Sequence, residues 1–246
     1  MPQGSILGPL LFLIYINDIC YSSSVLKFIL FADDTNLFHS SKSISDLQQV
    51  LNHEMSALSE WFKANRLSLN IDKTSYILFC AGNARSIPQH SFELFIESFK
   101  VKQVESCKFL GVYLDEKLTW KTHIEQITSK MSKAIGIISR IKHILPKYIL
   151  HTLYYTMIYP YLHYCNIVWA STYPSRLEKL VVLQKIIRII SACKYRDHTL
   201  NYFKELHIFK FPDINFLQTA LFMYNIHVDR KLLPSHLMKT VFSIMQ

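Results

Sequence analysis

The chain has 246 residues, a formal net charge of +9, a hydrophobic fraction of 50% and an aromatic fraction of 13%. This composition excludes intrinsic disorder, because there is enough apolar surface to bury a core, and the length suits one large domain or two small ones. The longest nearly unbroken apolar run, residues 10–16, is far shorter than the roughly 20 residues that a membrane-spanning helix needs, and the opening residues do not read as a signal peptide.

The first predicted element is a helix over residues 6–19, with Pro9 tolerated in its first turn. The segment is apolar nearly all round, which predicts that the helix is buried. Gln3, Gly4 and Ser5 precede it. They would lie where the free N–H groups of a helix N-terminus can meet a backbone phosphate or a base.

A β-hairpin is predicted next, with strands at residues 25–30 and 35–38 joined by a tight turn at Phe31-Ala32-Asp33-Asp34. Two adjacent carboxylates repel each other unless a cation lies between them. Mg²⁺ prefers hard oxygen ligands and often binds one or two carboxylates together with substrate phosphates. The turn therefore suggests a metal site for phosphoryl transfer. The alternative is a solvated Asp-Asp pair in an ordinary turn.

The middle of the chain predicts an α+β arrangement. An amphipathic helix is expected at residues 43–65, capped by Ser43 or Ser45, followed by a turn at 67–74 and a strand at 75–80. A loop is expected at 82–90, a hairpin from 91–96 and 100–104, and a strand at 108–114.

From residue 119 onward the pattern predicts helices. One is expected at 121–143, with a face that carries Lys130, Lys133, Arg140 and Lys142 against Glu125 alone. Others are expected at 146–159, ended by Pro160, at 175–193, and at 213–227, capped by Asp213. Six tyrosines between residues 148 and 164 would serve core packing or base stacking.

Charge is divided unevenly along the chain. Residues 1–114 carry nine Lys or Arg and ten Asp or Glu, whereas residues 115–246 carry 18 and eight. A nearly neutral part joined to a basic helical part suits a nucleic-acid enzyme, although a generic basic surface gives the same count. The five cysteines show no CxxC spacing, which favours reduced intracellular thiols, and the helical histidines do not pair into a metal site.

Four motifs in order carry a resemblance. They are Pro2-Gln3-Gly4-Ser5 with Gly8-Pro9; Phe31-Ala32-Asp33-Asp34; Leu69-Asn70-Ile71-Asp72-Lys73-Thr74; and residues 109–115 with Thr119-Trp120. The series resembles the reverse transcriptase of non-LTR retrotransposons of the jockey type. The resemblance implies an α+β fold: part of a polymerase palm over 1–118, a helical thumb over 119–200 and a helical extension over 201–246.

The resemblance also implies residue roles. Asp33 and Asp34 match the palm acids that bind catalytic Mg²⁺, with Asp33 the better direct ligand, and Lys73 matches the position proposed to protonate the pyrophosphate leaving group. At Lys73 an ordinary surface lysine is an equal alternative. The remaining implied contacts to template, primer and incoming nucleotide are Gln3, Gly4, Ser5, Phe31, Ala32, Phe109, Leu110 and Gly111, and the implied thumb contacts are Lys121, Lys130, Lys133, Arg140 and Lys142.

The family's fingers and first palm strand, with its own metal-binding Asp, lie upstream of the Gln-Gly motif. We therefore expect a fragment, because Asp18, Asp46 and Asp72 have no evident reason to complete the metal site. In the intact enzyme the expected reaction is Mg²⁺-dependent extension of a DNA primer along an RNA template from deoxynucleoside triphosphates, inside the cell and without a membrane. Alone, the chain is expected to show little activity. The alternatives are a non-catalytic RNA- or DNA-binding remnant and an α+β protein without a ligand; the oligomeric state stays open.

Overall fold

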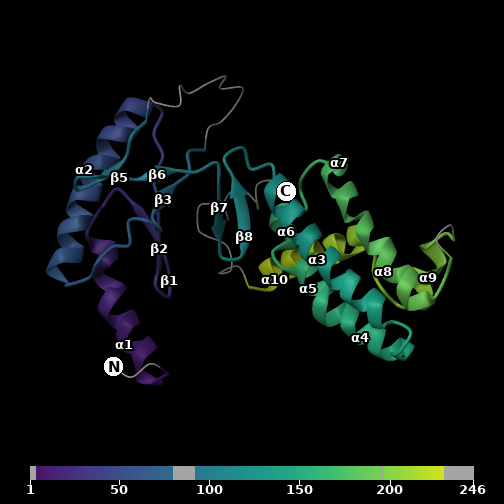
Figure 1. Ribbon diagram of the computed structural model, residues 1–246. Helices are drawn as coiled ribbons and strands as arrows, with labels where there is room; N and C mark the ends of the chain where they lie inside the picture. Colours follow the sequence, from purple (N-terminus) through teal and green to yellow (C-terminus); the bar gives the residue numbers. More distant parts are fainter. Residues whose placement is uncertain (1–3, 80–91, 195–196, 230–246) are drawn as a thin grey trace. The chain divides into compact units, whose positions relative to one another are not determined.

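The computed structural model describes residues 4–79, 92–194 and 197–229. The chain divides into two units, residues 1–105 and residues 106–246 (Figure 1). Each unit has its own buried apolar cluster.

The first unit mixes helices with very short strands. In chain order its elements are α1 (Leu7–Ile16), η1 (Asn17–Tyr21), β1 (Lys27–Phe31), β2 (Asp34–Phe38), α2 (Ile44–Ala64), β3 (Ser75–Tyr76), β4 (Phe95–Ile96), β5 (Phe99–Lys100) and β6 (Lys102–Gln103). The pairs β1–β2 and β4–β5 are antiparallel, and β3 pairs with β6 in parallel.

Helix α2 supplies much of the apolar core of this unit. Its sequence has apolar residues at three- and four-residue spacing, which gives one continuous apolar face. That face buries Leu47, Met55, Leu58 and Phe62 against the β4–β6 segment. Ser43 caps the helix, because its hydroxyl accepts a hydrogen bond from the Asp46 N–H at 3.4 Å. The predicted helix and its Ser43 cap are confirmed.

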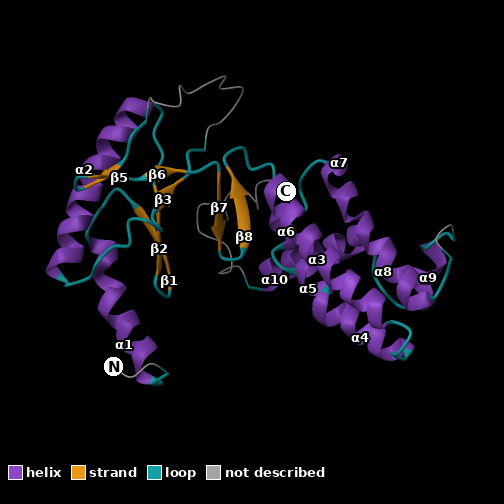
Figure 2. Ribbon diagram, in the orientation of Figure 1, coloured by secondary structure: helices purple, strands orange, loops and turns teal. Residues whose placement is uncertain are grey.

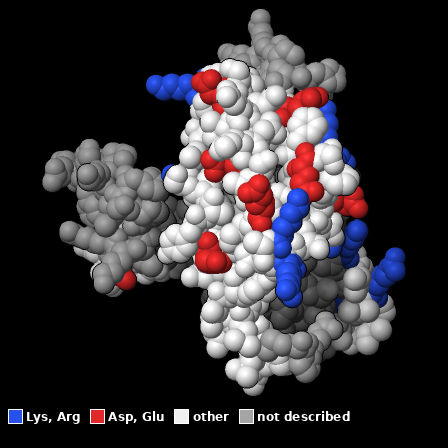
Figure 3. All heavy atoms as spheres, turned by 90° about the vertical axis from the view of Figure 1, so that its left-hand side faces the viewer, with Lys and Arg blue, Asp and Glu red and all other residues white. Residues whose placement is uncertain are grey.

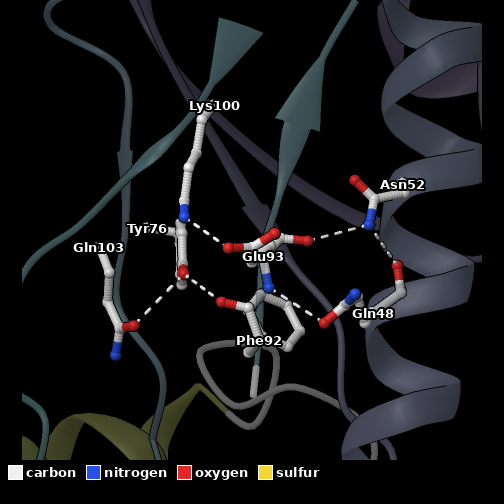
Figure 4. A network of polar contacts seen from close by, with 7 residues as sticks. All are labelled: Gln48, Asn52, Tyr76, Phe92, Glu93, Lys100 and Gln103. Carbon is white, nitrogen blue, oxygen red and sulfur yellow. Dashed lines mark hydrogen bonds and ion pairs between the residues drawn. The ribbon is translucent and has the colours of Figure 1, made fainter. Parts of the chain in front are cut away.

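Two amides on α2 hold the backbone of the β4 segment. The Asn52 side chain donates to the Glu93 carbonyl at 3.0 Å and accepts from the Phe95 N–H at 2.8 Å, so it pairs with this segment as a neighbouring strand would. One turn earlier, the side-chain oxygen of Gln48 accepts from the Glu93 N–H at 3.0 Å (Figure 4). The two amides therefore satisfy backbone groups at an edge of β4 that no described strand covers, which fixes α2 against β4.

A tyrosine extends this polar network on the other side. The Tyr76 hydroxyl donates to the Phe92 carbonyl at 3.0 Å and lies 3.3 Å from a Gln103 oxygen (Figure 4). Glu93 also forms an ion pair with Lys100 at 2.6 Å. Burial of the Tyr76 ring raises the pKa of its hydroxyl, with Lys100 opposing the shift and Glu93 adding to it. The hydroxyl therefore stays protonated and able to donate.

The second unit begins with a hairpin and continues as helices (Figure 2). Its elements are β7 (Ser106–Phe109), β8 (Val112–Asp115), α3 (Lys121–Ile141), α4 (Lys147–Met157), α5 (Tyr159–His163), α6 (Asn166–Trp169), α7 (Pro174–Leu177), η2 (Glu178–Val181), α8 (Val182–Ser191), α9 (Leu200–Glu205) and α10 (Phe211–Val228). The core lies among α3, α4, α8 and α10. At its centre the Trp169 ring stacks on Phe211, with centroids 5.3 Å apart.

The mixed α+β fold class is confirmed, and so are most predicted helices and the β1–β2 hairpin. The strand predicted at 75–80 is reduced to β3 among its described residues, and the hairpin predicted from 91–96 and 100–104 pairs only β4 with β5, because Lys102–Gln103 pairs with β3 instead. Three helix predictions need correction. Residues 174–191 form α7, η2 and α8 in place of one helix, and Pro160 opens α5 rather than ending a helix. Asp213 lies in the first turn of α10, whose N-cap is Lys210, so it is not the cap. The predicted strand at 108–114 is a hairpin, because Leu110 and Gly111 adopt positive φ angles and reverse the chain. The predicted loop at 82–90 lies outside the described residues.

Helix α1 differs most from its prediction. It is apolar nearly all round, which predicted burial, yet only Ile16 is fully buried. Phe12 packs on the core, and the Tyr15 hydroxyl donates to the Asn65 carbonyl at the end of α2. Five large apolar residues stay largely exposed, because the described part of the unit packs against one side of α1 only: Leu7, Leu10, Leu11, Leu13 and Ile14.

Across the described residues, no helix combines the length and the apolar character that crossing a membrane requires.

Candidate active site

The turn of the β1–β2 hairpin presents the two adjacent acids. Phe31 and Asp34 form the last cross-strand pair, so Ala32 and Asp33 are the two residues of the turn. Ala32 has φ of 51°, in the left-handed region that two-residue hairpin turns require. Asp33 and Asp34 are both exposed. The predicted hairpin and the position of the acids at its tip are confirmed; their metal-binding role stays a prediction.

Asp33 and Asp34 are the right chemical type for Mg²⁺ but do not make a complete cage. No cluster of three or more His, Cys, Asp or Glu side chains that could hold a metal ion occurs among the described residues. Asp18 lies exposed in η1, and Asp46 and Asp72 are exposed on α2 and in the turn before β3. The two hairpin acids could therefore supply part of a site, with the remaining ligands coming from substrate phosphates and a further carboxylate.

The turn before α1 is described from Gly4 onward, and Gln3 lies outside the described residues. Gly4 has φ of +91°, and a Cβ added there would meet nothing within 4 Å. The Ser5 hydroxyl accepts a hydrogen bond from the Gly8 N–H at 3.2 Å. Glycine is favoured at this φ, and it leaves the backbone open to approach by another molecule.

Lys73 lies exposed in the turn between α2 and β3. Its backbone N–H donates to the carbonyl and to the side-chain oxygen of Asn70, both at 3.2 Å. The ion pairs found among the described residues do not include Lys73, Asp33 or Asp34. The turn therefore fixes the backbone of Lys73 and leaves its ammonium group in solvent.

The tip of the β7–β8 hairpin belongs to the second unit. Leu110 and Gly111 form its turn, with φ of 45° and 88°. The Tyr164 hydroxyl donates to the Leu110 carbonyl at 2.6 Å, and a Cβ at Gly111 would lie 3.2 Å from the Tyr164 ring. Glycine is favoured at this position for two reasons: the positive φ strains any residue with a Cβ, and a Cβ would contact the Tyr164 ring closely. The group that approaches Gly111 closely is therefore a side chain of the same unit.

Asp115 organises the connection from this hairpin to α3. Its buried carboxylate accepts hydrogen bonds from the Thr119 N–H at 2.8 Å and the Trp120 N–H at 2.7 Å. Its carbonyl accepts from the Leu118 N–H at 2.8 Å. Leu118 and Trp120 have φ of 49° and 62°, so this strained turn depends on Asp115. The Thr119 carbonyl then accepts from Thr172 and Arg176.

His123 is buried between aromatic rings just after this turn. It lies 5.3 Å from the Trp169 ring and 6.5 Å from the Tyr113 ring, and its Nδ1 accepts from the Tyr113 N–H at 3.4 Å. Its Nε2 is buried without a hydrogen-bond partner among the described residues. Burial lowers the pKa of His123 to about 4, and the charge of Lys130 acts in the same direction. His123 is therefore neutral at physiological pH.

The basic side chains of the implied thumb all lie on or just after α3 and are exposed: Lys121, Lys130, Lys133, Arg140 and Lys142. Lys130 also lies over the Tyr161 ring, 5.6 Å from its centroid. The only acid on α3, Glu125, pairs with Lys179 at 2.5 Å, which lowers the pKa of that carboxyl. The solvent face of α3 is therefore strongly basic.

The first unit differs in charge. Residues 1–105 carry eight Lys or Arg and ten Asp or Glu, whereas residues 106–246 carry 19 and eight. On the face shown in Figure 3, acidic and basic side chains are interspersed and separated by broad uncharged surface. Positive charge is therefore concentrated in the second unit, the half that the composition indicated.

Asp115, Gln48 and Asn52 have structural roles that pattern reading did not assign. Asp115 lies six residues before the first residue of α3, too far from the helix for an ordinary N-cap, so the local pattern did not indicate its role. Gln48 and Asn52 are spaced four apart on α2, but an amide on a helix usually faces solvent, so nothing in the sequence indicated their partners.

Over most of its length the chain is similar to polymerases of mobile elements. Residues 1–114 match the family described as reverse transcriptase (RNA-dependent DNA polymerase). The chain is 27% identical over 215 residues to the probable RNA-directed DNA polymerase from transposon X-element of Drosophila melanogaster, which covers 82% of this chain and 23% of the relative. It is 27% identical over 242 residues to the RNA-directed DNA polymerase from mobile element jockey of the same species, covering 92% and 26%.

A third relative, the jockey polymerase of Drosophila funebris, is 26% identical over 224 residues, which is 87% of this chain and 24% of that protein. The chain thus spans about a quarter of the length of these curated relatives. No solved structure matches it significantly.

Proposed function

We propose that the chain is part of an RNA-directed DNA polymerase of a non-LTR retrotransposon. The proposal is supported by two findings: residues 1–114 belong to the reverse transcriptase family, and most of the chain is distantly homologous to the jockey and X-element polymerases. In the whole enzyme the chain would contribute the two-acid hairpin to Mg²⁺-dependent nucleotidyl transfer. The observation that carries the proposal is the pair Asp33 and Asp34, exposed together at a tight turn inside the matched segment.

In this proposal Asp33 and Asp34 bind Mg²⁺ together with the triphosphate of the incoming nucleotide. The metal would supply charge stabilisation at the reacting phosphorus, and the hairpin would fix where its two carboxylates meet the metal. A further carboxylate would complete the site, because the described residues bring no third acid to the hairpin. Lys73, exposed in its own turn, would donate a proton to the leaving pyrophosphate.

The metal site can be tested without polymerase activity. Titrating the chain with Mg²⁺ is expected to shift the backbone amide resonances of residues 31–36 with an affinity on the order of millimolar, because two carboxylates leave most of the coordination to water. Asp33→Asn is expected to weaken this binding at least about tenfold, because it removes one of the two charged ligands.

The matched control is Asp72→Asn, which neutralises another exposed turn aspartate of the same unit. It should leave the titration unchanged. Equal binding by the wild type and Asp33→Asn would refute the metal site, as would shifts centred on residue 72 instead of the hairpin.

The basic second unit favours a second candidate, binding of nucleic acid without catalysis. The five exposed cations on and after α3 would follow the phosphates of a template–primer duplex. If all five make phosphate contacts, the logarithm of the affinity for an RNA–DNA hybrid should fall against the logarithm of salt concentration with a slope of about −4.5.

The double variant Lys133→Gln/Arg140→Gln is expected to reduce the magnitude of that slope by about 2. Its control, Lys27→Gln/Lys42→Gln, removes the same charge from exposed positions of the first unit. Affinity that does not change with salt, or equal losses in both double variants, would contradict a role for α3.

A further inference from the structure

The second unit holds a groove between α3 and α8 that the polymerase proposal does not use. Its volume is about 460 Å³. One face of α3 carries three small residues that line the groove, Ser132, Gly136 and Ser139. Their small side chains leave the groove open on this side. Gly136 leaves open space, since a Cβ added there would meet nothing within 4 Å. The small residues of α3 therefore form an opening that a larger side chain would fill.

The floor of the groove is aliphatic and its rim is basic. Ile135, Val182 and Ile189 line the floor, and Lys142, Lys185 and Arg188 contribute the charged groups. The lining contains no acid. Lys142 and Lys185 are exposed and take part in none of the ion pairs found between residues that the structure describes. An occupant of this groove must therefore combine an apolar part with a negative charge.

The sequence around the groove strengthens the requirement for an anion. Residues 126–196 contain eleven Lys or Arg and one acid, Glu178. Glu125, just before this stretch, is already paired with Lys179. A polyanion is the partner that such a field attracts over distance, and a nucleic-acid strand is a polyanion whose phosphates are spaced along flat, largely apolar bases.

We propose that the α3–α8 groove binds a nucleotide of single-stranded RNA or DNA, with the base over the aliphatic floor and its phosphates against Lys142 and Lys185. The groove proposal rests on the proposed function, in which exposed cations of α3 follow a template–primer duplex. It adds a site for an unpaired strand in the same unit. The cavity volume lies in the range of sites that enclose a small ligand. An unpaired base enters such a site without the unpairing energy that a duplex would have to supply.

The test measures fluorescence anisotropy of a labelled twelve-nucleotide oligo(dT) with the full chain, and of a blunt twelve-base-pair duplex. Gly136→Leu fills the groove from an exposed helix position and should weaken oligo(dT) binding about fivefold or more. Gly136→Ala adds only a methyl group in open space and should change it less than about twofold. An abasic twelve-mer, which keeps the phosphates, should bind Gly136→Leu and wild type alike.

The charge requirement is tested by Lys142→Gln/Lys185→Gln. It should reduce the magnitude of the salt slope for oligo(dT) by about 1.4. Lys117→Gln, which removes an exposed lysine of the same unit outside the groove, is the control and should reduce it less than half as much. Unchanged oligo(dT) binding by Gly136→Leu, or an equal loss of duplex binding, would overturn the proposal.

Displacement of oligo(dT) by an acidic, leucine-containing peptide at lower concentration than by unlabelled oligo(dT) would also overturn it, in favour of a protein partner. The Mg²⁺ titration of residues 31–36 reports on the first unit and is therefore independent of the groove. If oligo(dT) does not bind while Mg²⁺ shifts residues 31–36, the groove proposal fails and the polymerase assignment stands. If oligo(dT) binds while Mg²⁺ does not shift these residues, the metal site fails and binding in the groove stands.

Discussion

Replacing Asp115 with alanine is expected to destabilise the second unit by about 3 kcal/mol. The buried carboxylate accepts two backbone N–H groups at 2.8 and 2.7 Å, and both lose their partner in the variant. The same turn holds Leu118 and Trp120 at positive φ, so its strain would no longer be offset. The destabilisation would extend beyond the turn, because the Thr119 carbonyl accepts hydrogen bonds from the side chains of Thr172 and Arg176.

The measurement is urea unfolding followed by tryptophan fluorescence in a Trp61→Phe background, in which Trp120 and Trp169 report on the second unit. Asp213→Ala is the matched control, because Asp213 is exposed in the first turn of α10 and forms no cap hydrogen bond. It should cost less than about 0.5 kcal/mol. A loss below about 1 kcal/mol for Asp115→Ala would show that water replaces the carboxylate.

The second unit is also expected to lose about 2–3 kcal/mol of stability between pH 6.5 and pH 4 through His123 alone. In the unfolded chain this imidazole titrates near pH 6.5, whereas burial lowers its pKa in the folded unit to about 4. Between these values the unfolded state binds the extra proton, so stability falls as the pH falls. Well above pH 6.5 both states are neutral at this residue, so it contributes no slope there.

The physical cause is burial of the imidazole, whose Nε2 has no hydrogen-bond partner among the residues described. A protonated His123 would bury an N–H there without an acceptor, near the charge of Lys130. His123→Phe should therefore remove this part of the pH dependence, at some cost in stability because the Tyr113 N–H loses its acceptor.

The experiment compares urea unfolding at pH 7 and pH 4.5 for the wild type, His123→Phe and His143→Gln. Acids such as Glu125 add their own slope, but they are the same in all three proteins. His143→Gln removes an exposed histidine and should keep the full wild-type dependence. An identical pH dependence in His123→Phe and wild type would contradict the assignment.

Local pattern was sufficient for a good part of the fold. Helices α2 and α3 were predicted because each has one continuous apolar stripe, and the β1–β2 hairpin was predicted because two apolar runs flank a two-residue turn. The family was predicted because four short motifs occur in a fixed order, which is information that the sequence carries directly.

Elements that depend on neighbours were not predictable. Residues 174–191 have a helical pattern throughout, and only packing breaks them into α7, η2 and α8. Composition made α1 look buried, but burial requires a partner surface on every side, and the described unit covers one side. Pro160 looked like the end of a helix, although proline is equally at home in a first turn.

By itself the sequence determined that two adjacent acids lie at a hairpin tip, that the chain is related to reverse transcriptases, and that its positive charge falls in the helical half. Each of these depends on residues close together in the chain or on composition. Only the tertiary structure decided that Asp115 holds the turn before α3, that His123 is buried without a partner for Nε2, and that Lys142 and Lys185 share one groove. These depend on residues brought together by packing, whose burial and partners no local pattern encodes.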